Sequence, residues 1–185
     1  MNLPPKTLWE LQEVGKDLYS HGLVTSHGGN LSLRSGMGMW ITGTGTMLGR
    51  LRERHISFVH PDGHHEGPPP SSDTVLHSTI YAITSAQAVA HAHARHMTAL
   101  SFDTDLFVPP DFEGALHLTD VPIIAPGPRQ TEQIASALQS RLVVFLRGHG
   151  AYARGNTVWE ALHWVMALEE SAQIEVLRRS ISGRA

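Results

Sequence analysis

Apolar residues near the start of the chain recur at the spacing of an α-helix. Residues 7–20 place them on one face behind Thr7, which we expect to be the N-cap. The same period predicts a longer helix from about Thr157 to Arg179. Its inward stripe comprises Val158, Leu162, Val165, Ala172 and Val176. Both helices should therefore bury one face against a common core.

The intervening sequence alternates short apolar runs with glycine turns and shorter helical segments. Strands are expected within 26–46, at 55–60, 88–93 and 121–126, and in 141–155 as one buried strand that runs into a glycine turn. Helices are expected behind a cap at Ser71 or Ser72, and over 95–101 and 129–140. The inward positions of the first of these helices should be Val75, Leu76, Thr79 and Ile80. Apolar residues in 103–120 follow neither the helical nor the strand spacing, so we expect a loop or lid there.

This order of helices and strands lacks a strict strand–helix–strand rhythm, and it predicts a layered α/β domain with a mixed or largely antiparallel sheet. A chain of 185 residues that is 41% hydrophobic fits one domain, 1–185, with a real core. The longest apolar runs, such as 142–146, fall far short of the ~20 residues that span a bilayer. The first twelve residues show no signal-peptide pattern.

Charge and cysteine content exclude further classes of function. The net charge is -3 and the cationic residues are scattered, so neither a nucleic acid nor an anionic membrane is an expected partner. The chain has no cysteine, which removes disulfides and thiolate chemistry and fits a cytoplasmic protein. Any metal must therefore be held by His, Asp or Glu.

Histidines supply the first candidate chemistry, in the segment AVAHAHARH at 88–96. In a strand, His91 and His93 would point to the same face, where two imidazoles suit a divalent metal. His149, in a glycine turn after an apolar run, is the best third ligand, and three histidines with an open position are typical of catalytic zinc. The alternative is that these are ordinary core or rim histidines. The remaining candidates lie in an exposed loop or have no matched partner: His60, His64, His65, His77, His96, His117 and His163.

Three loops are rich in glycine and hydroxyl groups and could hold an anion. They are SHGGNLS at 26–32, TGTGT at 42–46 and PPSSDT at 69–74. Glycine allows turns that aim successive N–H groups at one point, and a helix start after the serines would add its own N–H groups. Each loop taken alone is better explained as a hairpin turn or a helix cap, and none matches a P-loop or dinucleotide motif.

Five ordered motifs carry a resemblance to a known family. They are GLVTSHGGNLSLR, WITGTGTMLGRL, PPPSSDTVLHSTIY, AVAHAHARHMTALS and RGHGAYARGNTVWEALHWVMALEESA. In this order they resemble the class II aldolase/adducin superfamily, over roughly residues 8–178. The resemblance implies a three-layer α/β/α sandwich, assembled as a homotetrameric ring with active sites between subunits.

The same resemblance implies a set of site residues. A zinc ion, or Mn²⁺, Co²⁺ or Fe²⁺, would be held by His91, His93 and His149. A substrate phosphate would be cradled by Asn30, Thr44, Gly45, Ser71 and Ser72. Asp73 would be the catalytic residue that moves protons, while the metal stabilises an enediolate of a small phosphorylated sugar.

Two departures separate this chain from the aldolases of that superfamily. Asp73 stands where they carry glutamate and resembles the epimerase form of the motif. Segment 97–125 has no tyrosine to act as the acid, and its ionisable acids include Asp103, Asp105, Asp111 and Glu113. The chain is also shorter than expected for the epimerase.

Three functions therefore stand open. The leading hypothesis is a metal-dependent, aldolase-like lyase acting on a sugar phosphate. An epimerase, decarboxylase or dehydratase on the same scaffold is the second. A non-catalytic, adducin-like interaction domain is the third, although a scaffold has no need of three metal-binding histidines.

Overall fold

The computed structural model describes residues 2–183. Its helices are α1 (Pro5–Ser20), α2 (Thr74–Ile83), α3 (Arg95–Leu100), α4 (Phe112–Leu118), α5 (Gln130–Ala137) and α6 (Val158–Ser182), with short 3-10 turns at Leu48–Arg50 and Glu53–His55. Its strands are β1 (Asn30–Ser35), β2 (Gly38–Thr42), β3 (Ile56–Val59), β4 (His65–Glu66), β5 (Ala88–Ala92), β6 (Leu106–Phe107), β7 (Val121–Ile124), β8 (Val143–Leu146) and β9 (Gly150–Gly155).

Within residues 2–183, nine strands form one sheet in the order β4-β3-β2-β1-β5-β9-β8-β7-β6. The β7–β8 pair is parallel, and every other neighbouring pair is antiparallel. The expected mixed, largely antiparallel sheet is therefore confirmed. The three central strands β1, β5 and β9 come from distant parts of the sequence, so segments around residues 30, 91 and 152 become neighbours.

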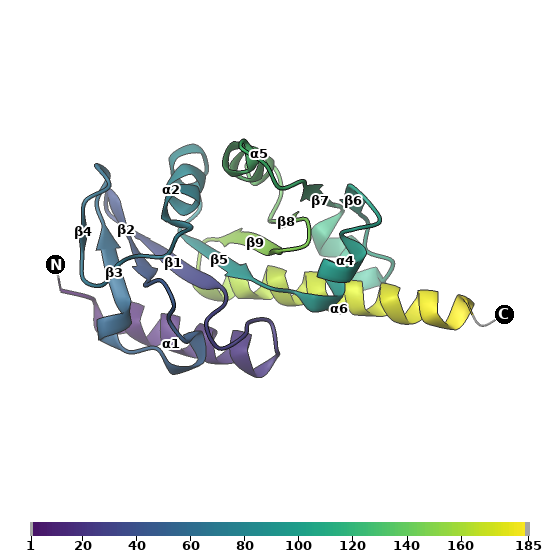
Figure 1. Ribbon diagram of the computed structural model, residues 1–185, viewed down its shortest axis with the longest axis horizontal. Coiled ribbons are helices and arrows are strands. Elements are labelled where there is room, and N and C mark those ends of the chain that lie inside the picture. The colour runs from purple at the N-terminus through teal and green to yellow at the C-terminus, as the bar shows by residue number, and fades with distance from the viewer. Residues whose placement is uncertain (1, 184–185) are drawn as a thin grey trace.

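Helices cover both faces of the sheet, as Figure 1 shows: α2 and α5 lie on one side and α1 and α6 on the other. Each face has its own buried core. Ala88, Ala90 and Ala92 of β5 face the α1 and α6 side, where small side chains let α6 approach closely. Val89 belongs to the opposite core with residues of α2 and α5. This arrangement confirms the expected three-layer sandwich.

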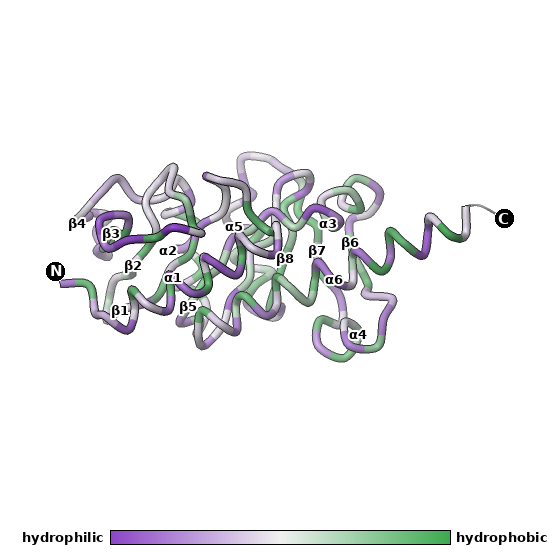
Figure 2. Tube along the Cα trace, turned by 90° about the horizontal axis from the view of Figure 1, so that it is seen from below, coloured by the Kyte–Doolittle hydropathy of each residue, from purple (hydrophilic) through white to green (hydrophobic). Residues whose placement is uncertain are grey.

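Helix α6 is the longest element and begins where the sequence predicts. The Thr157 side chain caps it by accepting a hydrogen bond from the Glu160 N–H at 3.1 Å. Figure 2 shows α6 extending past the other elements at its C-terminal end. None of the helices within 2–183 combines the length and apolarity that crossing a bilayer requires.

Two expected helix starts are wrong. Helix α1 begins at Pro5 rather than behind Thr7, because the fixed φ of proline suits the first turn of a helix. Helix α2 begins at Thr74, with Asp73 rather than either serine at the N-cap position. Val75 points outward and is 69% exposed, so the buried face of α2 instead includes His77 and Tyr81.

Two further segments are more ordered than expected. The predicted lid at 103–120 contains β6 and α4, and the Asp111 side chain caps α4 by accepting from the Gly114 N–H. The sequence of this segment shows no helical periodicity because α4 is only about two turns long. Segment 141–155 forms two antiparallel strands, β8 and β9, rather than one strand and a turn.

A glycine in the middle of α1 reveals how closely this helix approaches the loop after β2. A Cβ on Gly15 would overlap the Leu48 carbonyl group, 3.0 Å from its carbon. We expect Gly15→Ala to destabilise the fold by about 1–3 kcal/mol through overpacking, although alanine gains about 1 kcal/mol of helix propensity. Thermal unfolding followed by circular dichroism measures this. Gly127→Ala, where nothing lies within 4 Å of the added Cβ, is the control, and equal stability of both variants would contradict the prediction.

Candidate active site

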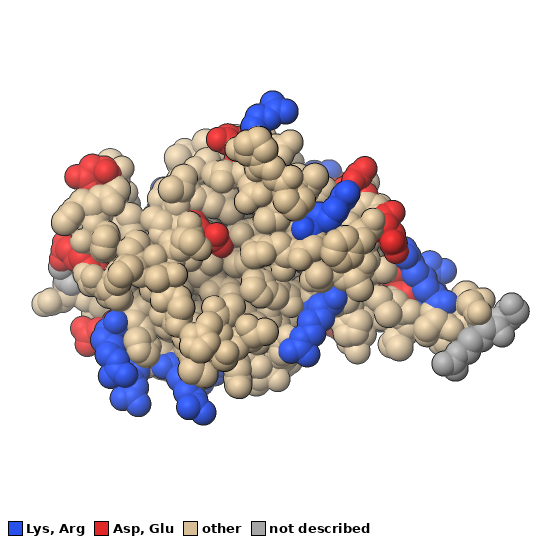
Figure 3. Space-filling view, in the orientation of Figure 1, with Lys and Arg blue, Asp and Glu red and all other residues tan. Residues whose placement is uncertain are grey.

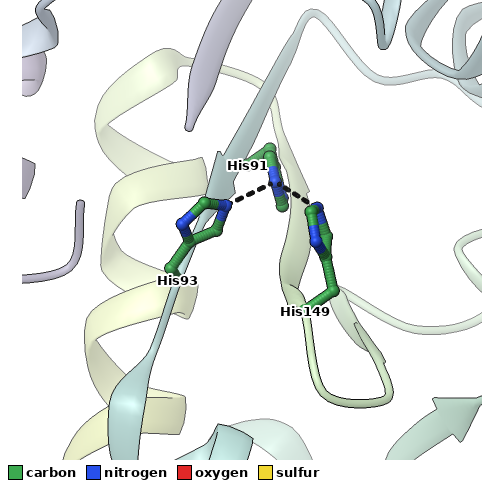
Figure 4. Close-up of side chains that lie close together, drawn as sticks. All are labelled: His91, His93 and His149. Carbon is green, nitrogen blue, oxygen red and sulfur yellow. Dashed lines mark hydrogen bonds between the residues drawn. The ribbon is translucent and has the colours of Figure 1, made fainter. Parts of the chain in front are cut away.

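Three histidines converge on one point beside the centre of the sheet (Figure 4). His91 lies on β5, His93 directly follows that strand, and His149 lies in the turn between β8 and β9. The Nε2 atom of His91 is 3.2 Å from Nε2 of His93 and 3.1 Å from Nε2 of His149. The ligand atoms of all three lie within 4.8 Å of one another.

These separations fit a tetrahedral metal ion. Zinc bound to imidazole nitrogens at about 2.0–2.1 Å places neighbouring ligand atoms about 3.3 Å apart. The two measured Nε2 separations lie close to that edge length. Three imidazoles with no thiolate leave a fourth position open, which is the donor set of a catalytic site.

The hydrogen bonding of His91 presents the right atom to a metal. Its Nδ1 donates to the Ala151 carbonyl at 2.9 Å, which leaves the Nε2 lone pair directed at the other two rings. Burial lowers the pKa of His91, despite the opposing charge of Asp73. Burial also lowers the pKa of His93, helped by the nearby His149. Both imidazoles are therefore neutral near pH 7, the form that binds metal.

Two glycines make room for these rings. A Cβ on Gly28 would lie 2.9 Å from Cε1 of His93, and one on Gly150 would lie 2.8 Å from Cε1 of His91. Neither distance is sterically allowed, so any larger residue would displace an imidazole. The glycine turn that the sequence places next to His149 thus serves close packing around the histidines.

Asp73 lies directly beside the three histidines. Its Oδ2 is 3.9 Å from Nε2 of His91, and accepts hydrogen bonds from Asn30 Nδ2 at 2.8 Å and from the Tyr152 hydroxyl at 3.1 Å. Burial alone would raise the pKa of Asp73, but the interaction with His91 and these hydrogen-bond donors hold it below its usual value. The carboxylate is therefore ionised and available to a metal or a proton.

Strand register explains why these groups meet. Asn30 of β1 pairs with His91 of β5, which in turn pairs with Tyr152 of β9. Directly paired residues of antiparallel strands project to the same face. The three side chains consequently form a row across the sheet, with Asp73 above it. Tyr152 was not expected from the sequence, since only the pairing of β5 with β9 identifies it.

The predicted phosphate residues lie along the adjoining loops. Ser71 is buried, its N–H donates to the Thr42 carbonyl, and its hydroxyl accepts from the Asp73 N–H at 3.2 Å. Ser72 is exposed. The N–H of Thr44 donates to the Pro69 carbonyl at 3.0 Å, so the TGTGT loop lies against the segment that leads to the serines.

Thr44 and Gly45 line a groove of about 460 Å³. Its other lining residues are Gly43, Thr46, Met47, Arg50, Arg52, Arg54, His55, Pro68 and Pro69. It therefore presents three guanidinium groups and, within the described residues, no acidic side chain. Asn30, Ser71 and Ser72 lie outside this lining. Elsewhere, Figure 3 shows Lys and Arg side chains spread around the periphery of one face rather than in a continuous stripe.

The other histidines and the acids of 103–113 have local partners. His96 binds Glu169 at 2.8 Å, His60 binds Glu66 at 2.9 Å, and His77 is fully buried against the Ser32 hydroxyl at 2.7 Å. His64 and His65 are exposed, as expected of a loop. The acids pair or cap as follows: Asp103 with Arg179, Asp105 with Arg147, Glu113 with His117, and Asp111 on α4.

Comparison with known proteins assigns the family. A family model described as the class II aldolase and adducin N-terminal domain matches residues 9–176. The L-fuculose phosphate aldolase of Escherichia coli K12 is 33% identical over 168 residues, which cover 87% of this chain and 78% of that protein. The methylthioribulose-1-phosphate dehydratase of Methylococcus capsulatus is 33% identical over 185 residues, covering 90% of this chain and 91% of that protein.

Structural comparison agrees with the sequence match. The crystal structure of L-fuculose-1-phosphate aldolase from Thermus thermophilus superposes with a TM-score of 0.89 at 35% identity, covering 96% of each chain. The fold is thus shared along nearly the whole length of both chains. The chain therefore belongs to the class II aldolase and adducin family, in which it is an aldolase-like lyase.

Proposed function

We propose that this protein is a zinc-dependent lyase that forms or cleaves a carbon–carbon bond in a small phosphorylated sugar. The observation that carries the proposal is the convergence of three imidazole Nε2 atoms, with an ionised carboxylate 3.9 Å away. Relatives named as fuculose phosphate aldolases support the substrate class.

The roles follow from the chemistry of the groups. His91, His93 and His149 would hold the divalent cation, which supplies positive charge to the oxygens of the substrate on which negative charge develops. Asp73 would take a proton from the substrate and return it, since its carboxylate is ionised and reaches the same space.

The phosphate of the substrate would bind at the loops beside Asp73. Asn30, Ser71 and Ser72 would contribute from the sheet edge and the start of α2, with Thr44 and Gly45 from the TGTGT loop. The three arginines of the adjoining groove support this placement, because guanidinium groups stabilise a dianion. Holding the phosphate fixes the reacting carbons relative to Asp73.

A dehydratase is the second candidate. The observation in its favour is the Methylococcus capsulatus dehydratase, which is as similar in identity as the Escherichia coli aldolase and covers more of the chain. Its name also specifies a phosphorylated keto-sugar, so the same metal and phosphate sites serve both candidates.

We also propose a cytoplasmic homotetramer. Large apolar side chains stand exposed on and just before α4 and near the C-terminal end of α6, and exposed apolar surface is typical of interfaces. They are Val108 (61%), Phe112 (79%), Leu116 (61%), Leu177 (54%) and Ile181 (72%). The cysteine-free composition fits the cytoplasm.

The decisive assay follows carbon–carbon chemistry by NMR. We expect purified protein to condense dihydroxyacetone phosphate with a short aldehyde, to lose activity on chelation, and to regain it with Zn²⁺. Elemental analysis before chelation identifies the native metal among Zn²⁺, Mn²⁺, Co²⁺ and Fe²⁺. Loss of water from a phosphorylated keto-sugar, without fragmentation, would favour the dehydratase. Absence of metal-dependent chemistry across a panel of phosphorylated keto-sugars would refute both.

The third imidazole provides a direct test of the metal site. His149→Ala should reduce metal affinity by at least the roughly 10- to 100-fold that loss of an outer-shell partner costs, because a ligand itself is removed. His149 lies in an exposed turn, so the fold should survive. Metal content is measured by elemental analysis, with the exposed His163→Ala as control. Equal metal content in both variants would rule out His149 as a ligand.

Asp73→Asn separates proton transfer from metal binding. The amide keeps the shape of the carboxylate but cannot accept a proton, so kcat should fall about 10²- to 10⁴-fold. Metal content should be retained, since the three imidazoles remain. The matched control is Asp62→Asn, in an exposed loop. Undiminished kcat in Asp73→Asn would exclude Asp73 as the proton-transfer group.

A further inference from the structure

Tyr152 contacts both Asp73, the proposed proton-transfer group, and His91, a proposed metal ligand. Its hydroxyl donates to Oδ2 of Asp73 at 3.1 Å, and its ring stacks on His91 with centroids 4.2 Å apart and planes 11° apart. The side chain is 2% exposed, so both contacts are shielded from solvent. We propose that Tyr152 is a positioning residue that orients Asp73 for proton transfer and holds the ring of His91 in place for the metal.

The two carboxylate oxygens of Asp73 differ in their hydrogen bonding. Oδ2 receives both protein donors, from Asn30 on one side and Tyr152 on the other. Within the described residues, Oδ1 receives no hydrogen bond. A carboxylate held through one oxygen by two donors cannot rotate freely, so Oδ1 is the atom left to exchange a proton with substrate.

The Tyr152 hydroxyl is suited to act only as a donor. It faces a carboxylate oxygen, which can only accept, so the phenol O–H is the donor of this hydrogen bond. Asn30 cannot replace it, because its amide approaches from β1 on the opposite side of His91. Losing the hydroxyl would leave Asp73 anchored at one side only.

The ring of Tyr152 has a separate effect from its hydroxyl. The ring of His91 is nearly parallel to two others, at 11° to Tyr152 and 10° to His149, and its Nδ1 is fixed by the Ala151 carbonyl. Stacking therefore restricts the ring of His91 in the orientation that presents Nε2. A residue that keeps the ring should keep metal binding, whereas an aliphatic residue should weaken it.

Two substitutions separate these effects. Tyr152→Phe retains the ring and removes the hydroxyl, so kcat should fall about 10- to 100-fold with KM and metal content unchanged. Tyr152→Leu removes both, and should also lower metal affinity by about tenfold or more. Metal affinity is measured by competition with a chromophoric chelator, which does not depend on activity.

The control is Tyr81→Phe, another buried tyrosine whose hydroxyl is hydrogen-bonded, to Ser32 at 2.8 Å, and which does not contact Asp73. It removes a comparable buried hydroxyl and should leave kcat within about twofold. If Tyr81→Phe and Tyr152→Phe lower kcat equally, the effect is one of general stability and the inference is overturned.

The inference rests on the proposed function, and the assays distinguish their failures. If the wild type has no metal-dependent lyase or dehydratase activity, the proposed function fails. If the wild type is active and Tyr152→Phe matches it in kcat, the positioning role of the hydroxyl fails alone. If Tyr152→Leu binds metal as tightly as the wild type, the role of the ring is refuted.

Discussion

The pairing of β5 with β1 and β9 is the constraint on which the site depends. It places Asn30, His91 and Tyr152 side by side on one face of the sheet, although they are far apart in sequence. A slip of one residue in either pairing would turn the row toward α6. The register is fixed at the far end of the same strands, where the Arg34 N–H donates to the Gln87 carbonyl and the Gln87 N–H donates to Gly155.

Electrostatics then determine the state of the buried groups in this row. A buried imidazole is more stable neutral than charged, and a buried carboxylate needs donors or a cation to remain ionised. His91 is consequently neutral and able to bind metal, while Asp73 is kept ionised by Asn30 and Tyr152. Neutral imidazoles at His91 and His93 beside the Asp73 carboxylate create a site whose negative charge a divalent cation complements. The charge of the site therefore favours the binding of a cation, in addition to the contribution of the ligand atoms themselves.

The fold and the three histidines were predictable from the sequence because each left a local signal. Three features can be recognised in the sequence alone: the spacing of His91 and His93 on a strand of small residues, the glycine turn around His149, and the amphipathic α6. No local sequence pattern identifies Tyr152, since its importance arises only from the pairing of its strand with His91. Helix α4 was missed because two turns are too short to show a helical period. Val75 was assigned inward because it is apolar and adjoins the buried Leu76 and Ile80 in the predicted stripe, but α2 turns Val75 itself toward solvent.

Similarity to both an aldolase and a dehydratase agrees with the roles proposed for these residues. Aldol cleavage and elimination of water from a keto-sugar both place negative charge on a substrate oxygen, which a bound cation stabilises in either case. The two reactions differ in the bond that breaks next, and hence in the acid that reaches the departing group. In segment 103–113, Asp111 caps α4 while Asp103 and Asp105 pair with arginines, so these side chains already have structural roles. We therefore expect Asp73 and its immediate surroundings to discriminate between the two reactions.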